Sequence, residues 1–525
     1  METVRPRTSA LASAPERLST AQRWMLALSC SAVALVVGSM AALYTALPEL
    51  ATATGATQKQ LTWIVDGYTL ALACLVLPAG ALGDRYGRRV VLVVGLFVFT
   101  LASAMPLVFD SPTWLIGARA AAGVGAALVM PSTLSLLTAG FPDDRRGNAV
   151  GLWAGVAGAG GVLGILGSGL LLERWSWLSV FLAMAVAGAL LMVAGCTIPE
   201  SVDQERPAMD LWGAATSAAA VGLIVVAAIE APSRGWLDPL VIVMFVGGVL
   251  AAGIFTLIEL RTAQPLLDVR LFARRGFAAG TMSVTVQFLV TFGVFMLLVQ
   301  FLQLILGYRP LTSALAMAPM VVPMVAISAV APWVADRIGL RLPTFAGLVV
   351  LGAGLVAVSR LNVDSSYLDV LWPLLVMSTG LGLCTAPATA AIIAGTPVEK
   401  HGVAAAVNDA AREVGAAIGI AVAGSILAAG YSDRIAPALP RLPEAAREPV
   451  GDSLAAALQV AERAGPQAQP LVEFAKAAFI HGAQQSCLAL GYVAFAAAVI
   501  VGIWAPGRTS PFLRSGRQRI PERAG

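Results

Sequence analysis

The chain has 525 residues, of which 58% are hydrophobic and only 12% charged, with a mean hydropathy of +0.81 and a formal net charge of +4. A soluble domain carries about 25% charged residues, so this chain lacks the polar surface that water requires on all sides. We therefore expect a membrane protein, and no basic face interleaved with aromatic residues indicates a nucleic-acid partner.

The first 23 residues are polar. The apolar run that follows reaches about residue 47 and contains no Asp, Glu, Lys or Arg. This run is too long for the apolar region of a signal peptide, and no small-residue cleavage pattern ends it. The sequence predicts an uncleaved first transmembrane helix after an N-terminal tail over 1–23.

A spanning helix needs about 20 mainly apolar residues, and the chain contains fourteen such runs. Their length favours helices over barrel strands, which alternate over about ten residues. We predict an all-α, polytopic membrane protein with both termini on one side. The predicted spans are 24–47, 61–82, 90–109, 112–140, 147–172, 177–198, 209–230, 238–258, 277–306, 311–335, 343–361, 369–395, 402–430 and 485–505.

The distribution of Lys and Arg predicts the orientation of these spans. With the N-terminus inside, the tails and inner loops hold 22 of the 34 Lys and Arg residues, whereas the outer loops hold 10. Basic residues are enriched on the cytoplasmic side of membrane proteins. We expect cytoplasmic termini and, for a chain rich in Ala, Gly and Arg, the inner membrane of a bacterium.

A charged string, residues 80–89, joins the second and third spans, and a weaker copy over 336–341 joins the tenth and eleventh. Glycines also recur: Gly147, Gly160, Gly164 and Gly169 return 255 residues later as Gly402, Gly415, Gly419 and Gly424. The repeat predicts two pseudo-symmetric six-helix bundles with two inserted helices, and related halves are typical of transporters. We therefore divide the chain into five parts: the N-terminal tail (1–23), the first bundle (24–200), a linker with the two inserted helices (201–262), the second bundle (263–505) and the C-terminal tail (506–525).

The segment 431–484 is polar and contains prolines, and we expect it outside the membrane. Two stretches, 452–463 and 469–481, have helical apolar spacing. A folded loop and a flexible one are both compatible with the sequence. The tail 506–525 is rich in Arg, Pro and Gly and is expected to be disordered.

Within the string, Gly80 permits close helix approach, as small residues do in membranes. Asp84 can accept hydrogen bonds from backbone N–H groups or pair with an arginine. The arginines can reach phosphates or acidic partners, or simply anchor the loop on the inner side. The gate candidates are Gly80, Asp84, Arg85, Gly87, Arg88, Arg89, Asp336 and Arg337.

The string resembles the G-x-L-x-D-R-x-G-R-R motif of the major facilitator superfamily. With fourteen spans, the chain is similar to the drug:proton antiporter branch, including bacterial quaternary-ammonium and multidrug efflux pumps. Further resemblance lies in the motifs around Trp63 and Asp66, around Arg119, and around Asp409 and Glu413. The resemblance covers about residues 24–505.

This resemblance implies two bundles around a central cavity, a cytoplasmic gate in which Asp84 and Arg88 change partners, and a role for Arg119 in coupling protons to substrate. The chain differs from the family pattern at three positions. Ser39 replaces an acidic residue that would favour divalent cations, Ile165 replaces a proline of the antiporter signature, and Ala122 replaces a glutamine.

Charged residues inside spans cost about 2.5–3.5 kcal/mol on insertion scales and are functional candidates by default. Asp66 lies near the outer end of its span and can carry a proton or bind a cation, or it is an interfacial carboxylate. Arg119 lies deeper and can bind a carboxylate, either as a coupling residue or as a static ion pair.

Asp409 and Glu413 lie four residues apart and share one helix face. Two carboxylates at this spacing repel each other, and desolvation disfavours their charge, so either can take up a proton. Arg412 lies three residues from Asp409 and can neutralise it, which would leave Glu413 as the free proton site. The coupling candidates are Asp66, Arg119, Asp409 and Glu413.

Four further residues are candidates for lining the cavity: Tyr44, Trp63, Gln300 and Gln303. The rings can face a cation, although aromatic anchoring at the outer interface explains them equally well. The glutamines can line the cavity or hydrogen-bond across helices.

We expect a proton-coupled antiporter that exports hydrophobic, cationic drugs or antibiotics and acts as a monomer. One alternative is an exporter dedicated to one natural product or lipid, and another is a membrane sensor or scaffold that transports nothing. The five cysteines lack metal spacing, and no P-loop or nucleophile elbow is present, so we expect no metal, no cofactor and no enzymatic activity.

Overall fold

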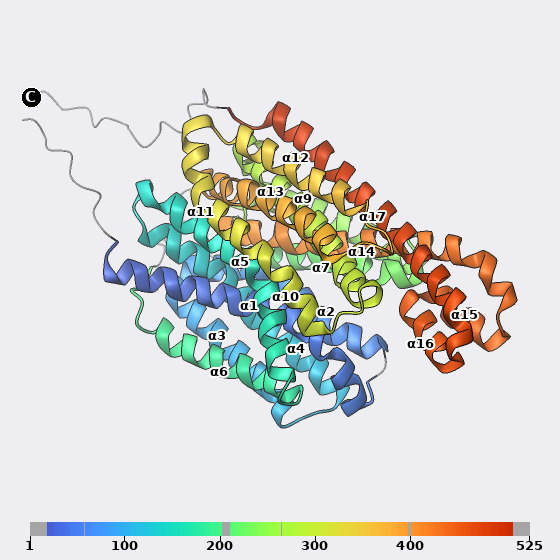
Figure 1. Cartoon of the computed structure of the whole chain (residues 1–525). Helices are drawn as coiled ribbons and strands as arrows, with labels where there is room; N and C mark the ends of the chain where they lie inside the picture. Colours follow the sequence, from blue (N-terminus) through green and yellow to red (C-terminus); the bar gives the residue numbers. More distant parts are fainter. Residues whose placement is uncertain (1–17, 57, 202–209, 264, 397–400, 508–525) are drawn as a thin grey trace, which may run out of the picture.

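The computed structural model describes residues 18–56, 58–201, 210–263, 265–396 and 401–507. Within these ranges all regular structure is helical, and fourteen helices are long and apolar enough to cross a membrane. The predicted all-α membrane fold is confirmed. Both ends of the described chain lie at the same end of the molecule (Figure 1). The tails predicted over most of 1–23 and 506–525 lie outside the described residues.

The first bundle contains six helices. They are α1 (Thr20–Thr54), α2 (Gln58–Tyr86), α3 (Arg88–Ala104), α4 (Pro112–Gly140), α5 (Asp143–Leu172) and α6 (Leu178–Gly195), with a short 3-10 turn, η1 (Met105–Leu107), after α3. The two inserted helices are α7 (Leu211–Arg234) and α8 (Pro239–Arg261).

The second bundle repeats the first after the 3-10 turn η2 (Val269–Ala273). Its helices are α9 (Arg275–Gln300) with the π-helical turn η3 (Phe301–Ile305), α10 (Pro310–Met317), η4 (Ala318–Met320), α11 (Val321–Ile338), α12 (Arg341–Val358), α13 (Tyr367–Ala394), α14 (His401–Ile435) and α17 (Gln469–Trp504). The predicted span 311–335 is thus one path through the membrane, interrupted by η4 at Pro319.

Local sequence explains where several helices start and stop. Ser19 accepts a hydrogen bond from Gln22 N and forms a capping box at the start of α1, and Gly55 ends that helix with φ 67°. The side chains of Asp210 and Asp238 accept hydrogen bonds from backbone N–H groups at the starts of α7 and α8. These side chains satisfy backbone groups that would otherwise lack partners at a helix end.

The glycine repeat seen in the sequence is a repeat of helix packing. On α5, Gly164 lies against the backbone of Gly38 on α1, and a side chain there would overlap it. On α14, Gly419 lies in the same way against Leu289 on α9. Small residues let membrane helices approach closely. The two bundles are therefore built around equivalent contacts, α1 with α5 and α9 with α14.

The two bundles meet along two helix pairs, α2 with α14 and α5 with α11. Gly80 lies against the backbone of Gly402 in the first pair, and Gly147 lies against Pro332 in the second. Gly402 is the repeat of Gly147, so the interface is pseudo-symmetric. These contacts lie at the end of the bundles that carries the 80–89 string, which we call the latch face.

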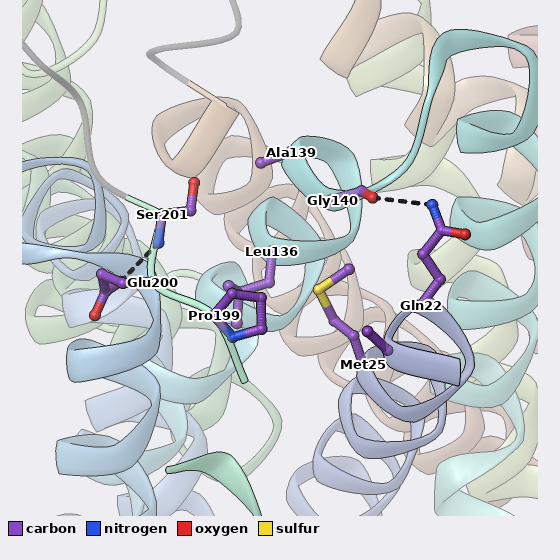
Figure 2. A pocket seen from close by; sticks show the side chains of 9 residues that line it. Gln22, Met25, Leu136, Ala139, Gly140, Pro199, Glu200 and Ser201 are labelled. Atoms are coloured by element: carbon purple, nitrogen blue, oxygen red, sulfur yellow. Dashed lines mark hydrogen bonds between the residues drawn. The ribbon is translucent and has the colours of Figure 1, made fainter. Parts of the chain in front are cut away.

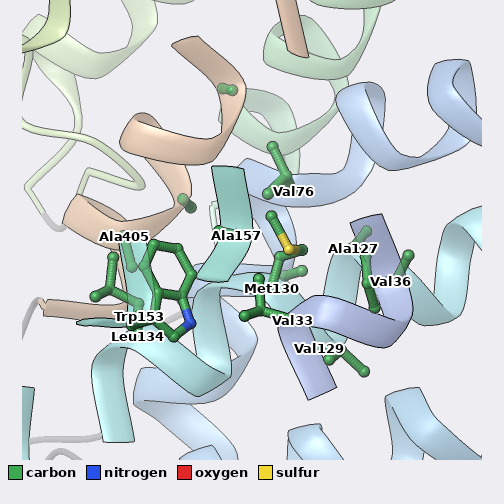
Figure 3. Packing of buried hydrophobic residues seen from close by; sticks show 14 of the residues in the cluster. Val33, Val36, Val76, Ala127, Val129, Met130, Leu134, Trp153, Ala157 and Ala405 are labelled. Carbon is green, nitrogen blue, oxygen red and sulfur yellow. The ribbon is translucent and has the colours of Figure 1, made fainter. Parts of the chain in front are cut away.

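Trp153 on α5 is the largest side chain in the central packing and is fully buried. Its indole nitrogen donates to the Thr133 hydroxyl on α4 over 3.1 Å. Figure 3 shows Trp153 among small and medium apolar residues, with Ala405 of the other bundle nearby. The core therefore extends across the boundary between the bundles.

The inserted helix α7 lies between the bundles. A small apolar cluster joins it to α2 on one side and α14 on the other, through Ala73, Val225, Ala228, Ala417 and Ala421. At the opposite end from the latch face, the Trp236 indole donates to Ser425 on α14 over 2.9 Å. Helix α8 covers α7 and is mostly exposed to the surroundings, as expected for a lipid-facing helix.

The segment 431–484 is folded and helical. Helix α14 continues to Ile435, followed by the 3-10 helix η6 (Ala436–Arg441), α15 (Glu444–Asp452), α16 (Leu454–Ala464) and η7 (Pro466–Ala468). These helices project beyond the bundles (Figure 1). The stretch 452–463 corresponds to α16, but 469–481 is the first part of α17. The last span therefore begins well before residue 485, because the helix continues past its apolar part.

We predict that Tyr431→Phe loosens this projecting unit without disturbing the bundles. The Tyr431 hydroxyl donates to Val450 O over 2.9 Å and is part of a buried contact between α14 and α15. Losing one such bond costs about 1 kcal/mol, so proteolysis within α15 and α16 should accelerate about fivefold. Tyr492→Phe, at a ring that is 66% exposed, is the control. Equal cleavage rates for both variants would contradict the role of this bond.

Candidate functional site

Asp84 connects the two bundles at the latch face. One carboxylate oxygen, Oδ1, accepts from Gly402 N over 3.0 Å, and the other, Oδ2, accepts from Val403 N over 3.2 Å. These amides belong to the first turn of α14, although Asp84 lies on α2. Arg88 adds two hydrogen bonds to Oδ1, at 2.9 Å from Nη2 and 3.2 Å from Nε. We call this group, Asp84 with Arg88, Gly402 and Val403, the latch.

The latch is strong for a physical reason. The N-terminus of a helix carries a partial positive charge and backbone N–H groups without intrahelical partners. Asp84 is only 3% exposed, and charge-assisted hydrogen bonds are stronger than neutral ones. Arg88, which is equally buried, balances the carboxylate charge. One side chain therefore caps a helix of the opposite bundle while its own charge is neutralised.

The weaker copy of the string makes no equivalent connection among the described residues. Asp336 and Arg337 are exposed, and the Arg337 guanidinium lies 3.7 Å from the ring centre of Trp333 on its own helix. Arg85 similarly lies over its neighbour Tyr86. In the described part of the chain, the hydrogen-bonded latch thus lies on the α2–α14 side of the pseudo-symmetric interface.

Arg119 is buried inside the first bundle at the junction of α1, α2 and α4. Its guanidinium donates to Ser39 O and Ile64 O, each over 3.3 Å, and its Cζ atom lies 4.2 Å from the centre of the Tyr68 ring. No carboxylate among the described residues lies within ion-pair distance of it. The static ion pair considered from the sequence is therefore absent, and carbonyl oxygens and a ring stabilise this charge.

Asp66 is half-buried on α2, and Tyr44 and Trp63 accompany it near the end opposite the latch face. Tyr44 interacts electrostatically with both Asp66 and Arg119, which places these three residues in one region. The charge of Glu230 on the inserted helix α7 also acts on Asp66, and Glu230 is paired with Arg234 over 2.6 Å. The contribution of α7 to this region could not be inferred from the sequence.

Asp409 and Glu413 are buried on the face of α14 that meets the other bundle. Asp409 Oδ1 lies 3.7 Å from Arg412 Nη1 and accepts from Asn408 Nδ2 over 3.3 Å. The second oxygen of Asp409 and one oxygen of Glu413 have no hydrogen-bond partner among the described residues. A buried polar oxygen without a partner is uncommon and is a site where a proton or a cation can bind.

The pair of Asp409 and Arg412 confirms the local contact considered from the sequence, yet Arg412 also serves as a bridge between the bundles. Its guanidinium lies 4.5 Å from the ring centre of Phe288 on α9 and 5.5 Å from that of Trp153 on α5. Cation–π contacts stabilise a charge that has lost its water. The roles of Trp153 and Phe288 could not be read from the sequence, since both have ordinary apolar surroundings there.

Two buried hydrogen-bonded pairs lie near Asp409 within the second bundle. Asn408 accepts from the Thr389 hydroxyl over 3.0 Å, and one turn away on α13 Thr385 donates to Gln287 over 2.6 Å. All four residues are buried. The spacing of Thr385 and Thr389, four residues apart, is the sequence signal that could have identified these pairs. Gln300 and Gln303 are half-buried at the end of α9 and in η3, outside this group.

The arrangement brings Asp409 and Glu413 to the interface between the bundles, whereas Arg119 lies inside the first bundle and Asp66 lies near the end opposite the latch face. Tyr68, whose ring contacts Arg119, also lies within the electrostatic reach of Glu413 on the other bundle. No group of three or more potential metal ligands exists among the described residues. This chemistry suits the binding of protons and organic cations between two movable bodies.

The Major Facilitator Superfamily model matches residues 29–420. The multidrug resistance protein Stp of Mycobacterium tuberculosis is 34% identical to this chain over 398 residues, which cover 75% of this chain and 74% of Stp. The tetracenomycin C resistance and export protein of Streptomyces glaucescens is 31% identical over 85% of this chain and 84% of its own length.

Among solved structures, the proton:xylose symporter XylE has a similar fold. It superposes with a TM-score of 0.58, covers 93% of this chain and 96% of its own, and is 14% identical in sequence. At this identity the comparison shows the fold alone, and it agrees with the two bundles described above.

We predict that Asp84→Asn opens the latch. Replacing the carboxylate removes the charge from hydrogen bonds that are each worth about 1.5–3 kcal/mol, so amide exchange at Gly402 and Val403 should accelerate at least about tenfold. Hydrogen exchange with mass spectrometry on the full chain in lipid nanodiscs measures this. Asp336→Asn, the equivalent change at the exposed copy, is the control. Unchanged protection of α14 in Asp84→Asn would show that the latch does not hold the bundles together.

Proposed function

This chain belongs to the major facilitator superfamily, and on that premise we propose that it exports hydrophobic, cationic drugs or antibiotics in exchange for protons. The fourteen spans and the sequence similarity to a multidrug resistance protein and an antibiotic export protein support this proposal. The observation that carries it furthest is the pair of buried carboxyl groups, Asp409 and Glu413, each with an oxygen that lacks a partner at the bundle interface.

A buried carboxyl group can hold a proton or pair with a cation, but not both at once. Competition of this kind couples two flows if the protein exposes the group alternately to each side. Asp409 and Glu413 lie on α14, which contacts α2, α4 and α7 as well as its own bundle. Movement between the bundles would change the surroundings of these carboxyl groups, which is what alternating access requires.

The remaining charged candidates support this exchange. Asp66, half-buried near the opposite end of α2, would receive cations or protons on the outer side, with Tyr44 and Trp63 beside it. Arg119, whose partners among the described residues are carbonyl oxygens and the Tyr68 ring, would tune the carboxyl groups as a fixed positive charge. Gln300 and Gln303 would contribute polar lining at the outer end of α9.

We assign the latch face to the cytoplasm, because the excess of Lys and Arg lies on that side. Both termini would then be cytoplasmic, and the helices α15 and α16 would project outward. A latch closed as described corresponds to a transporter sealed toward the cytoplasm. The proposed units are the bundle 24–200, the insertion 201–262 and the bundle 263–505, acting as a monomer in the inner membrane without a cofactor or an enzymatic step.

A narrower cargo is the second candidate. The similarity to the tetracenomycin C resistance and export protein favours an exporter dedicated to one natural product. Growth inhibition across dyes, quaternary ammonium compounds and antibiotics separates the two candidates. Broad resistance supports a multidrug exporter, whereas a single strong resistance supports a dedicated one.

We predict that the double variant Asp409→Asn, Glu413→Gln abolishes proton-driven uptake of a cationic dye into everted vesicles. Neither amide can exchange a proton, so an acidic vesicle interior can no longer drive transport. Expression should be unchanged, because a neutral amide costs less in the membrane than a buried charge. The exposed variant Asp336→Asn is the control and should transport at the rate of the unmodified protein. Transport by the double variant at that rate would remove both residues from the mechanism.

We also predict that extrusion stops when the pH difference is dissipated. In liposomes that contain the purified protein, an ionophore that collapses the proton gradient should reduce dye movement to that of empty liposomes. An ionophore that collapses only a potassium gradient is the control. Continued extrusion after the loss of the pH difference would contradict proton coupling, whatever the cargo.

A further inference from the structure

The short segment that follows α6, residues 197–201, contacts the two arginines that end the 80–89 string. We call this segment the clasp. Ser201 accepts two hydrogen bonds from Arg88. The backbone N of Arg88 donates to the Ser201 carbonyl over 2.9 Å, and Arg88 Nη1 donates to the Ser201 hydroxyl over 3.2 Å. Ile198 O accepts from Arg89 Nη1 over 3.1 Å. The clasp therefore contacts the string from a position more than 100 residues away in sequence.

Glu200 is the central residue of these contacts. Its Oε1 atom accepts from Arg89 N over 3.0 Å and from Ser201 N over 2.9 Å, and its Oε2 atom lies 3.4 Å from Arg89 Nε. Arg89 N belongs to the first turn of α3. Glu200 thus places a negative charge at the start of α3, where a helix favours one.

Helix α3 lacks a side chain of its own for this purpose. The residue before it, Gly87, has φ 106°, a conformation that favours glycine, and makes no side-chain cap. A Cβ atom at Gly87 would collide with the Glu200 carboxylate. The glycine therefore provides both the turn and the space, and Glu200 supplies the cap from another part of the chain.

Arg88 joins the clasp to the latch. Its guanidinium donates to Ser201 on one side and to Asp84 on the other, and Asp84 in turn accepts from the amides of Gly402 and Val403. An arginine has several rotatable bonds, and holding it in one geometry costs conformational entropy. Contacts that fix the backbone and the head group of Arg88 in place reduce that cost when the latch closes.

The clasp has space on its other side. A cavity of about 260 Å³ lies between the clasp and the start of α1. The residues that line it include Met25, Leu136, Pro199, Glu200 and Ser201. Figure 2 shows Glu200 and Ser201 at one edge of it and Gln22 and Gly140 at the other. The start of the clasp is anchored, since Trp24 Nε1 donates to the Thr197 hydroxyl over 2.8 Å. The cavity therefore leaves open space beside the end of the clasp, on the side away from α3.

We propose that Glu200 is a positioning residue for the latch: by capping α3 and holding the clasp against Arg89 and Arg88, it favours the arrangement in which Asp84 binds α14. This proposal rests on the proposed function in one respect, because it requires that the two bundles separate at the latch face during transport. Helix α7 begins soon after the clasp, so the clasp is also where the insertion joins the gate.

Hydrogen exchange on the full chain in nanodiscs, without substrate or pH gradient, tests this proposal. In Glu200→Gln the carboxylate is lost, and with it the negative charge that caps the start of α3. We expect the amides at the start of α14 to exchange roughly fivefold faster, together with those at the start of α3. Faster exchange at α3 with unchanged exchange at α14 would overturn the proposal, because Glu200 would then be only a local cap.

A double variant separates an effect through the latch from a general loss of stability. With Asp84→Asn already present, adding Glu200→Gln should not accelerate exchange at α14 further, whereas an additive effect would overturn the proposal. Glu473→Gln, at an exposed carboxylate on α17, is the matched control. Ser201→Ala removes one acceptor of Arg88 and should also accelerate amide exchange at the start of α14. This second variant keeps the test decisive if Glu200→Gln does not accumulate in the cell. None of these readouts depends on transport, so their failure leaves the proposed export untouched.

Discussion

The hydrogen bonds from the first turn of α14 to Asp84 are the interaction on which the arrangement of the two bundles depends. Membrane helices have little hydrophobic drive to associate, so close packing and polar contacts must hold the bundles together. Gly80 and Gly402 bring the helices into backbone contact, and this allows one carboxylate to reach two amides of the opposite bundle. A larger residue at either glycine would separate the helices and leave Asp84 without these donors.

The two bundles share their packing but not their chemistry. Gly164 and Gly419 make equivalent contacts with α1 and α9, whereas the buried charges have no equivalents. Position 154, which corresponds to Asp409, is an alanine, and position 158, which corresponds to Glu413, is a glycine. The repeat therefore supplies a frame that can move symmetrically, and each bundle adds its own charged residues at the interface. A buried charge is costly in lipid, so its presence within a span indicates a function at that position.

The fold could largely be predicted from the sequence, because fourteen apolar runs and a glycine repeat each follow from simple physical rules. For the segment 431–484 the sequence indicated two helical stretches but left a folded and a flexible loop open, and it did not predict that 469–481 continues into the last span, because that helix extends beyond its apolar part. At the candidate site, Asp409 and Glu413 could be proposed from the sequence because they are charged residues within a span and share a helix face. The clasp was not, because Glu200 and Arg89 lie 111 residues apart and neither belongs to a periodic pattern.

The latch and the proposed proton site lie on one rigid element. Gly402 and Val403 form the first turn of α14, and Asp409 lies about two turns further along, roughly 10 Å away by helix geometry. A helix transmits displacement along its axis, so a change at the carboxyl groups and a change at the latch need no chain of intermediate side chains to affect each other. Binding of a proton or a cation that favours one position of α14 must favour the corresponding state of the latch by the same free energy. The placement of both functions on α14 thus gives a direct physical route from occupancy to gate.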